Sequence, residues 1–219
     1  MQFAMDELVA EFEASTGKNI TYSSASSGQL YAQISKGAPF DLFLSANEAF
    51  AQKVYDNGKA IAAPIVYAEG QLILWTQKQL NLHAGINSLL DPNLKRIAIA
   101  NPESAPYGKA AKEALKAAGI WTEVESKIIY GQSISQVNHY INVKAVDCGI
   151  TAHSAIAHLS EIDKGEFILI DQSLYSPIRQ SMVRIKSENG DHQPTANQFF
   201  EYMQSKQAKA ILAGHGFKK

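Results

Sequence analysis

The sequence predicts an α/β fold with mixed, mainly parallel sheets flanked by helices and arranged as two lobes. Strand-like segments alternate with helix-like segments along nearly all of the 219 residues, which is typical of β/α units. The composition, 46% hydrophobic and 19% charged, is that of an ordinary globular protein. Extended segments around residues 67–71 and 174–179 are suited to cross between two lobes. We therefore expect a discontinuous lobe I over residues 1–67 and 176–219, and a lobe II over residues 68–175.

The first third of the chain is predicted to begin with a helix that ends at Gly17. Met5, Leu8, Val9 and Phe12 share one face of this helix at the helical period. The elements expected after it are a strand over residues 19–24, a helix over 28–37 with Leu30 and Ile34 facing the core, a strand over 40–46, and a helix between an N-cap at Asn47 and a stop at Gly58.

The remainder of the chain continues the alternation. The expected strands are apolar runs at residues 70–77, 96–100, 126–130, 147–152, 166–170 and 178–185. The expected helices cover residues 88–95 (a short helix or turn), 106–118, 133–143, 153–159, 194–205 and 205–214. Sheets of this class normally begin with a strand, so we expect either that a strand precedes Met1 or that one sheet lacks a member.

Charge and composition exclude several classes of protein. The formal net charge is −1, so we expect neither nucleic acid nor an anionic membrane surface as a partner. No apolar run reaches the roughly 18 residues that span a bilayer. The first residues do not form a signal peptide, so the signal of an exported protein would have been removed. Cys148 is the single cysteine, and its apolar surroundings predict a buried, unreactive thiol.

Three predicted helices begin without an acidic residue in their first turn. They start in the segments "SASSGQLYAQI", "APYGKAAKEAL" and "GQSISQVNHYI", each after a strand and a tight turn. Helix N-termini attract anions through their N–H groups and dipole, and in α/β sheets they converge at the carboxyl ends of strands. The simpler interpretation is that the serines are ordinary N-caps and that Pro106 occupies a common first position. The sequence leaves both interpretations open.

A site of neutral donors could bind an anion without lysine or arginine. Micromolar affinity corresponds to about −8 kcal/mol, and hydrogen bonds to a charged group contribute roughly 1.5–3 kcal/mol each. Five or six donors would suffice after the entropic costs of binding. A site without acceptors also favours a fully ionised tetrahedral anion over a protonated one such as hydrogen phosphate.

These segments, in this order, resemble the periplasmic molybdate-binding proteins of ABC importers. The resemblance rests on "SSASSGQLYAQISKGAPFDLFLSAN", "NPESAPYGKAAKEAL", "YGQSISQVNHYI" and the closing "KQAKAILAGHGF", and it runs over essentially the whole chain. It implies a two-lobe, hinge-closing receptor of the type II periplasmic-binding-protein class. Such a receptor is periplasmic and monomeric, is not an enzyme, carries no cofactor, and delivers molybdate or tungstate to a membrane permease.

The resemblance also implies the residues of the site. Ser27 matches a ligand that donates its backbone N–H and hydroxyl, whereas Tyr107 and Ile134 match backbone donors. The flanking residues expected to contribute are Ser26, Gly28 and Ser133. There are two departures. Ala152 stands where some members carry a tyrosine hydroxyl, and the family's first strand, with a further Ser or Asn ligand, would lie just before Met1.

Other candidate sites are weaker. The six scattered histidines do not show the spacing of a metal site; they are His83, His139, His153, His158, His192 and His215. Asp41 and Asp147 could form a catalytic pair, but we expect a structural role for Asp41. Lys109 is expected to be a solvated helix residue rather than an attractor of the anion.

Two classes of function therefore stay open. The first is an extracytoplasmic receptor for a tetrahedral oxyanion, with sulfate as an alternative ligand. The second is an effector-sensing domain of similar fold, which would normally carry a DNA-binding helix that this sequence lacks. An enzyme is the weakest alternative, because no nucleophile is paired with a general base and no GxSxG or P-loop motif is present.

Overall fold

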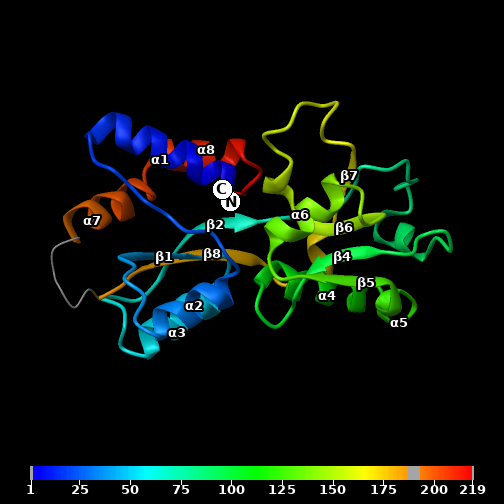
Figure 1. The fold of residues 1–219 in the computed structure, drawn as a ribbon, viewed down its shortest axis with the longest axis horizontal. Helices are drawn as coiled ribbons and strands as arrows, with labels where there is room; N and C mark the ends of the chain where they lie inside the picture. The colour runs from blue at the N-terminus through cyan, green and yellow to red at the C-terminus, as the bar shows by residue number, and fades with distance from the viewer. Residues whose placement is uncertain (1, 187–192, 219) are drawn as a thin grey trace. The chain divides into compact units, whose positions relative to one another are not determined.

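A computed structural model of the protein describes residues 2–186 and 193–218. The chain divides into two compact units, one made of Met1–Gly70 and Arg179–Lys219, the other of Gln71–Ile178 (Figure 1). We call them unit 1 and unit 2. The chain crosses from one to the other after Gly70 and after Ile178, close to the crossings expected from the sequence. His192, one of the candidate metal ligands, lies outside the described residues.

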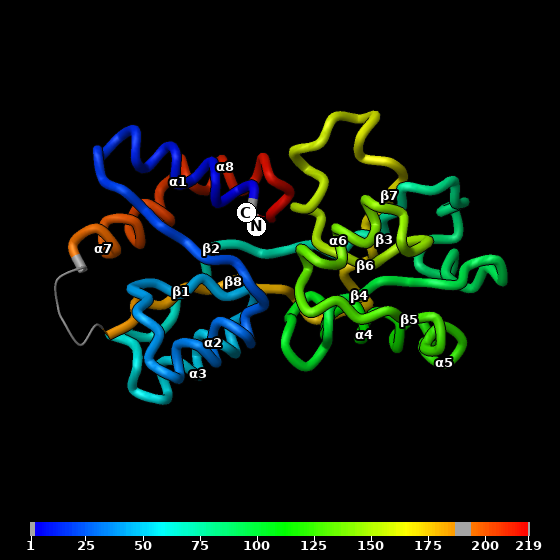
Figure 2. Tube along the Cα trace, viewed as in Figure 1, coloured from blue at the N-terminus to red at the C-terminus, as the bar shows by residue number. Residues whose placement is uncertain are grey.

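Unit 1 is a three-stranded sheet between two layers of helices. The strands are β1 (Leu42–Ser45), β2 (Ile65–Gly70) and β8 (Ile178–Arg184), in the order β1-β8-β2, and β1 pairs antiparallel with β8. The helices are α1 (Gln2–Thr16), α2 (Ser27–Ser35), α3 (Glu48–Asp56), α7 (Gln193–Tyr202) and α8 (Lys206–Gly214). Figures 1 and 2 show α1 and α8 on one side of the sheet and α2 and α3 on the other.

Alternation along the strands of unit 1 produces two cores. Met182 packs with the apolar face of α1 and with α7 and α8, whereas its neighbour Val183 packs with residues of α2 and α3. The predicted face of α1 is confirmed, since Met5, Leu8, Val9 and Phe12 are all buried. Phe12 also contacts the ring of Phe199 edge-on, at a centroid distance of 5.1 Å. The cores therefore fix the sheet between its two helical layers.

The strand predicted over residues 19–24 is wrong. This segment forms no strand, and most of its residues are exposed. The Ile20 N–H donates to a carboxylate oxygen of Glu13 at 2.7 Å, and the Tyr22 hydroxyl donates to Asp6, so α1 supplies these partners through side chains. β-propensity produces a strand only where a neighbouring strand offers a ladder, and none of the described strands pairs with this segment.

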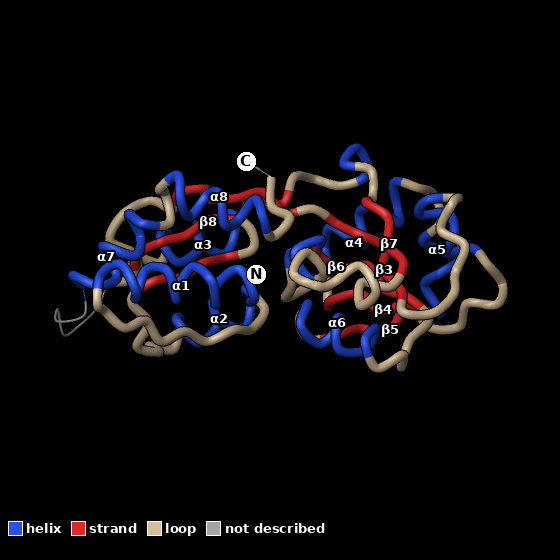
Figure 3. Tube along the Cα trace, turned by 90° about the horizontal axis from the view of Figure 1, so that it is seen from above, coloured by secondary structure: helices blue, strands red, loops and turns tan. Residues whose placement is uncertain are grey.

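Unit 2 is a five-stranded mixed sheet with the order β5-β4-β6-β3-β7. Its strands are β3 (Leu72–Thr76), β4 (Ile97–Ala100), β5 (Ile128–Gly131), β6 (Cys148–Ala152) and β7 (Glu166–Leu169). Its helices are α4 (Pro106–Ala117), α5 (Trp121–Val124), α6 (Ile134–Asn142) and the short 3₁₀-helices η1 (Gly85–Leu90), η2 (Glu125–Lys127), η3 (His153–Ala155) and η4 (Gln172–Leu174). Helices α4 and α6 cover opposite faces of the sheet (Figures 1 and 3).

The pairing in unit 2 follows from its connections. β4 is parallel to both β5 and β6, and helices α4 and α6 make the intervening connections. β3 pairs antiparallel with β6 and β7, and no long helix links β6 to β7. The helix predicted over residues 153–159 is wrong beyond its first turn, because the N–H groups of Ile156 and Leu159 bond three residues back. No helix among the described residues is long and apolar enough to cross a membrane.

Candidate functional site

The start of α2 combines a serine N-cap with two N–H groups that the cap leaves available. Ser26 is the N-cap; its hydroxyl accepts from the Gln29 N–H at 3.4 Å, while the Gln29 side chain accepts from the Ser26 N–H at 3.2 Å. This capping box satisfies the third N–H of the helix. The Ser27 and Gly28 N–H groups, at the first two positions, are directed out of the helix end, where a ligand oxygen can accept from them.

The Ser27 hydroxyl is held by the end of β1. Ser27 is only 5% exposed, and its Oγ accepts from the Ala46 N–H at 2.9 Å. Ala46 directly follows β1, so the helix start and the strand end are joined by this bond. A hydroxyl that accepts from one backbone N–H keeps its own proton for donation elsewhere. The Ser27 hydroxyl is therefore a hydrogen-bond donor whose position in unit 1 is fixed by the end of β1.

The start of α4 has no side-chain cap. Its N-cap is Ala105, and Pro106 at the first position has no N–H, so the donors of the first turn come from Tyr107 and Gly108. Gly108 lies against the end of β4: a Cβ built there would be 2.1 Å from the Ala100 carbonyl oxygen. Only glycine lets this helix begin so close to the strand.

The start of α6 repeats the arrangement of α2. Ser133 is the N-cap and accepts from the Gln136 N–H at 3.3 Å, and the Gln136 side chain accepts from the Gln132 N–H at 2.6 Å. The third N–H of the helix is again satisfied by the cap. The Ile134 N–H, at the first position, is directed out of the helix end in the same manner as that of Ser27.

Unit 2 brings its two predicted donors to one edge of its sheet. β4 and β5 are parallel neighbours, and α4 and α6 follow their carboxyl ends. The Asn101 N–H, in the turn before α4, donates to the Gly131 carbonyl at the end of β5 at 2.8 Å. The helix starts that carry Tyr107 and Ile134 therefore belong to the same edge, as expected for ligand sites in α/β sheets. Ser26, Ser27 and Gly28 belong to unit 1.

Lys109 is a solvated helix residue. Its side chain is 69% exposed and lies 3.9 Å from Glu113, one turn further along α4. Such an exposed i,i+4 pair contributes a few tenths of a kcal/mol to helix stability. The lysine near the helix start is thus explained by its partner within α4.

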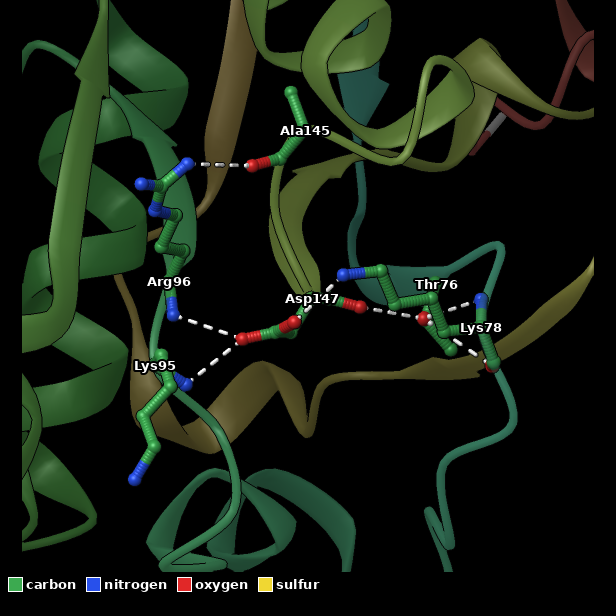
Figure 4. A network of polar contacts seen from close by, with 6 residues as sticks. All are labelled: Thr76, Lys78, Lys95, Arg96, Ala145 and Asp147. Carbon is green, nitrogen blue, oxygen red and sulfur yellow. Dashed lines mark hydrogen bonds and ion pairs between the residues drawn. The ribbon is translucent and has the colours of Figure 1, made fainter.

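Asp147 has a structural role. Its carboxylate accepts from the N–H groups of Lys95 and Arg96 at 2.8 and 2.9 Å and pairs with the Lys78 ammonium at 2.7 Å (Figure 4). Burial pushes the pKa of Asp147 upward, but these three hydrogen bonds outweigh burial and hold its pKa below the ordinary value. Asp147 and Asp41 belong to different units.

The cysteine is buried, and two of the described histidines contact other side chains. Cys148 is fully buried in β6, and burial, with the charge of Asp147, raises the pKa of its thiol to about 12, so the predicted unreactive thiol follows. His153 stacks on Phe167, and His215 pairs with Glu7 at 2.7 Å. Within residues 2–186 and 193–218, no group of three or more His, Cys, Asp or Glu side chains could hold a metal ion.

Ala152 is 3% exposed at the end of β6 and faces Leu72 across the ladder. Neither the Ala46 N–H that binds the Ser27 hydroxyl nor the contact of Gly108 with β4 was predicted from the sequence. The sequence signal of the second feature is the glycine that directly follows Tyr107.

Two α/β units whose helix starts present N–H groups at sheet edges are an arrangement found in solute-binding proteins. The sequence matches the family of bacterial extracellular solute-binding proteins over residues 1–218. The chain belongs to this family, and the predicted α/β fold with mixed sheets flanked by helices is confirmed. The expectation that the sheets are mainly parallel is wrong, because β1 pairs antiparallel with β8 and β3 pairs antiparallel with both of its neighbours.

Several relatives have named ligands. The molybdate-binding protein ModA of Rhodobacter capsulatus is 32% identical over 96% of this chain and 82% of the relative. ModA of Azotobacter vinelandii is 30% identical over 97% of this chain and 84% of the relative. The solved structure of the Azotobacter vinelandii periplasmic molybdate-binding protein matches with a TM-score of 0.93 at 30% identity, covering 100% of this chain and 95% of that one.

Proposed function

We propose that this protein is a periplasmic receptor for a tetrahedral oxyanion, molybdate or tungstate, which it delivers to the permease of an ABC transporter. The relatives at 30% and 32% identity, which are named as molybdate-binding proteins, support this ligand. The observation that carries the proposal is the shared construction of the helix starts. Caps at Ser26 and Ser133 satisfy the third N–H, and the first N–H groups, of Ser27 and Ile134, are left for an anion.

The proposed ligands are neutral hydrogen-bond donors. Ser27 donates its N–H and its hydroxyl, Tyr107 and Ile134 donate N–H groups, and Ser26, Gly28 and Ser133 flank them. The partial positive charge of each helix N-terminus adds to these bonds. Acid residues are absent from the first turns of α2, α4 and α6, so none of these turns places a carboxylate against a dianion. The receptor is proposed to act as a monomer and to catalyse no reaction.

Calorimetric titration with molybdate, tungstate, sulfate and phosphate tests the proposal. We expect tight binding of the first two anions and weak or no binding of phosphate, which keeps a proton near neutral pH. If sulfate binds more tightly than molybdate, sulfate is the ligand instead. If none of the four anions binds, the proposed receptor function is wrong.

Ser27→Ala tests the site. Loss of a hydrogen bond to a charged ligand costs roughly 1.5–3 kcal/mol, so the affinity for molybdate should fall about 10- to 150-fold. The matched control is Ser88→Ala, because Ser88 is also a buried serine but its Oγ has no hydrogen-bond partner among the described residues. Ser88→Ala should leave affinity unchanged. An unaltered affinity in Ser27→Ala would exclude its hydroxyl from the site.

A further inference from the structure

A hydrogen bond within the protein constrains the hydroxyl of Ser27. Its Oγ accepts from the Ala46 N–H, and within residues 2–186 and 193–218 this is the one hydrogen bond that the Oγ makes. Two positions remain around the oxygen, one for its proton and one for a lone pair. In the part of the chain that the structure describes, no protein atom accepts the proton of this hydroxyl, so the proton is available to a ligand oxygen. Donation to the ligand is therefore the favoured arrangement.

The Ala46 N–H is itself held by a buried polar cluster. We call Ser45, Ala46, Asn47 and Ser181 the strand-end cluster. The Asn47 N–H donates to the Ser45 Oγ at 3.2 Å, and the Ser181 hydroxyl donates to the Asn47 carbonyl at 3.1 Å. Asn47 also caps α3, because its side chain accepts from the Phe50 N–H. The turn that contains Ala46 is thus bound to β1, β8 and α3.

The two serines of the cluster occupy core positions. Ser45 and Ser181 are 0% and 1% exposed and lie opposite each other on β1 and β8. Apolar side chains would be the ordinary occupants of such positions, because a buried hydroxyl stabilises the fold only when it is hydrogen-bonded. Here both hydroxyls bond to Asn47. Their effect is to fix the backbone on either side of the Ala46 N–H.

We propose that Asn47 and Ser181 are positioning residues for oxyanion binding, which act through the Ala46 N–H and hold the Ser27 hydroxyl as a donor to the anion. This inference rests on the proposed function, since it concerns the same site.

A double-mutant cycle with Ser27 tests the positioning role. Ser181→Ala should lower the affinity for molybdate several-fold in the wild-type background and have no further effect in a Ser27→Ala background. A merely structural role would produce the same loss in both backgrounds. That additive result, or unchanged affinity in Ser181→Ala, would overturn the inference. Ser88→Ala serves again as the control for removal of a buried hydroxyl.

Ala46→Pro tests the N–H directly. Proline removes this donor, and the preceding residue, Ser45, has the strand conformation that proline tolerates. Affinity for molybdate should fall about tenfold in the wild-type background and little further in a Ser27→Ala background. A variant whose thermal unfolding matches the wild type and whose affinity for molybdate is unchanged would contradict the positioning role. If Ala46→Pro does not fold, the cycle on Ser181 decides.

The two proposals fail in different ways. If the wild-type protein binds none of the four oxyanions, the proposed function is wrong. If the wild-type protein binds molybdate but the cycle is additive, only the positioning role of the strand-end cluster is wrong.

Discussion

Asp147 connects three chain segments through its carboxylate and its backbone carbonyl. Its carboxylate binds the N–H groups at the start of β4 and the ammonium of Lys78, and its own carbonyl accepts from the Thr76 hydroxyl at 2.6 Å (Figure 4). Asp147 therefore joins the end of β3 to the amino ends of β4 and β6. Loss of the carboxylate would leave two N–H groups without their acceptor.

We expect Asp147→Ala to lower the free energy of unfolding by about 1–3 kcal/mol at neutral pH. Because the pKa of Asp147 is lowered in the folded protein, its contribution is present above the unfolded pKa of about 4 and is lost as the pH falls through the folded pKa. Urea unfolding at neutral and acidic pH measures this: the difference between wild type and variant should shrink in acid. Asp171→Ala is the control, since Asp171 binds only its local turn at the surface. An equal loss at both pH values would contradict the assignment.

At the scale of elements, the start of α4 depends on close contact with β4. Gly108→Ala would place a methyl group against the Ala100 carbonyl, so either α4 or the strand end must shift. We expect a loss of about 1–3 kcal/mol in stability and weaker oxyanion binding, because the N–H groups of the first turn move with the helix. Thermal unfolding and titration measure the two effects.

Gly214→Ala is the matched control for Gly108→Ala. Gly214 ends α8, and a Cβ there meets nothing within 4 Å. Its substitution should stabilise the protein by roughly 0.4–1 kcal/mol, since alanine restricts the unfolded chain. Equal effects of the two substitutions would show that the contact with Ala100 is unimportant.

Elements with a strong period and clear ends could be predicted from the sequence. The helix α1 follows from its apolar face and from Gly17, which has a φ of +69°, and α3 follows from Asn47 and Gly58. The segment at Ile20 and Tyr22 could not be assigned correctly from its own residues, because strand formation depends on a partner elsewhere in the chain. The turns after His153 likewise differ from a helix only in their hydrogen-bond spacing.

The whole molecule should be stabilised by its ligand. Binding to the folded state alone adds about 2.7 kcal/mol at a ligand concentration 100 times the Kd. For a chain of this size that corresponds to a rise of roughly 5–10 °C in Tm. Scanning calorimetry with molybdate should show this rise, and Ser27→Ala at the same molybdate concentration should show a smaller one. A similar rise with phosphate would contradict the proposed selectivity.

The parts of the site differ in how far the sequence reveals them. The acid-free first turns indicate the three helix starts, whereas Ser27, Tyr107 and Ile134 are implied by the family resemblance and remain predictions until binding is measured. The Ala46 N–H could not be found in this way, because its bond to Ser27 joins residues 19 positions apart and involves no distinctive side chain. The residue type of Ala46 does not mark its N–H as a donor, so this bond is seen only in the fold.

Because the thiol of Cys148 is buried, a cysteine introduced elsewhere in this protein can be labelled selectively. Cys148 is the one cysteine in the chain, and its high pKa keeps it in the unreactive protonated form. A cysteine introduced on the surface would then be the one site open to a maleimide dye. A fluorophore attached beside the start of α2 or α6 could report the arrival of an anion, without first replacing any native residue. The protein can therefore serve as the scaffold of an optical sensor for the anion.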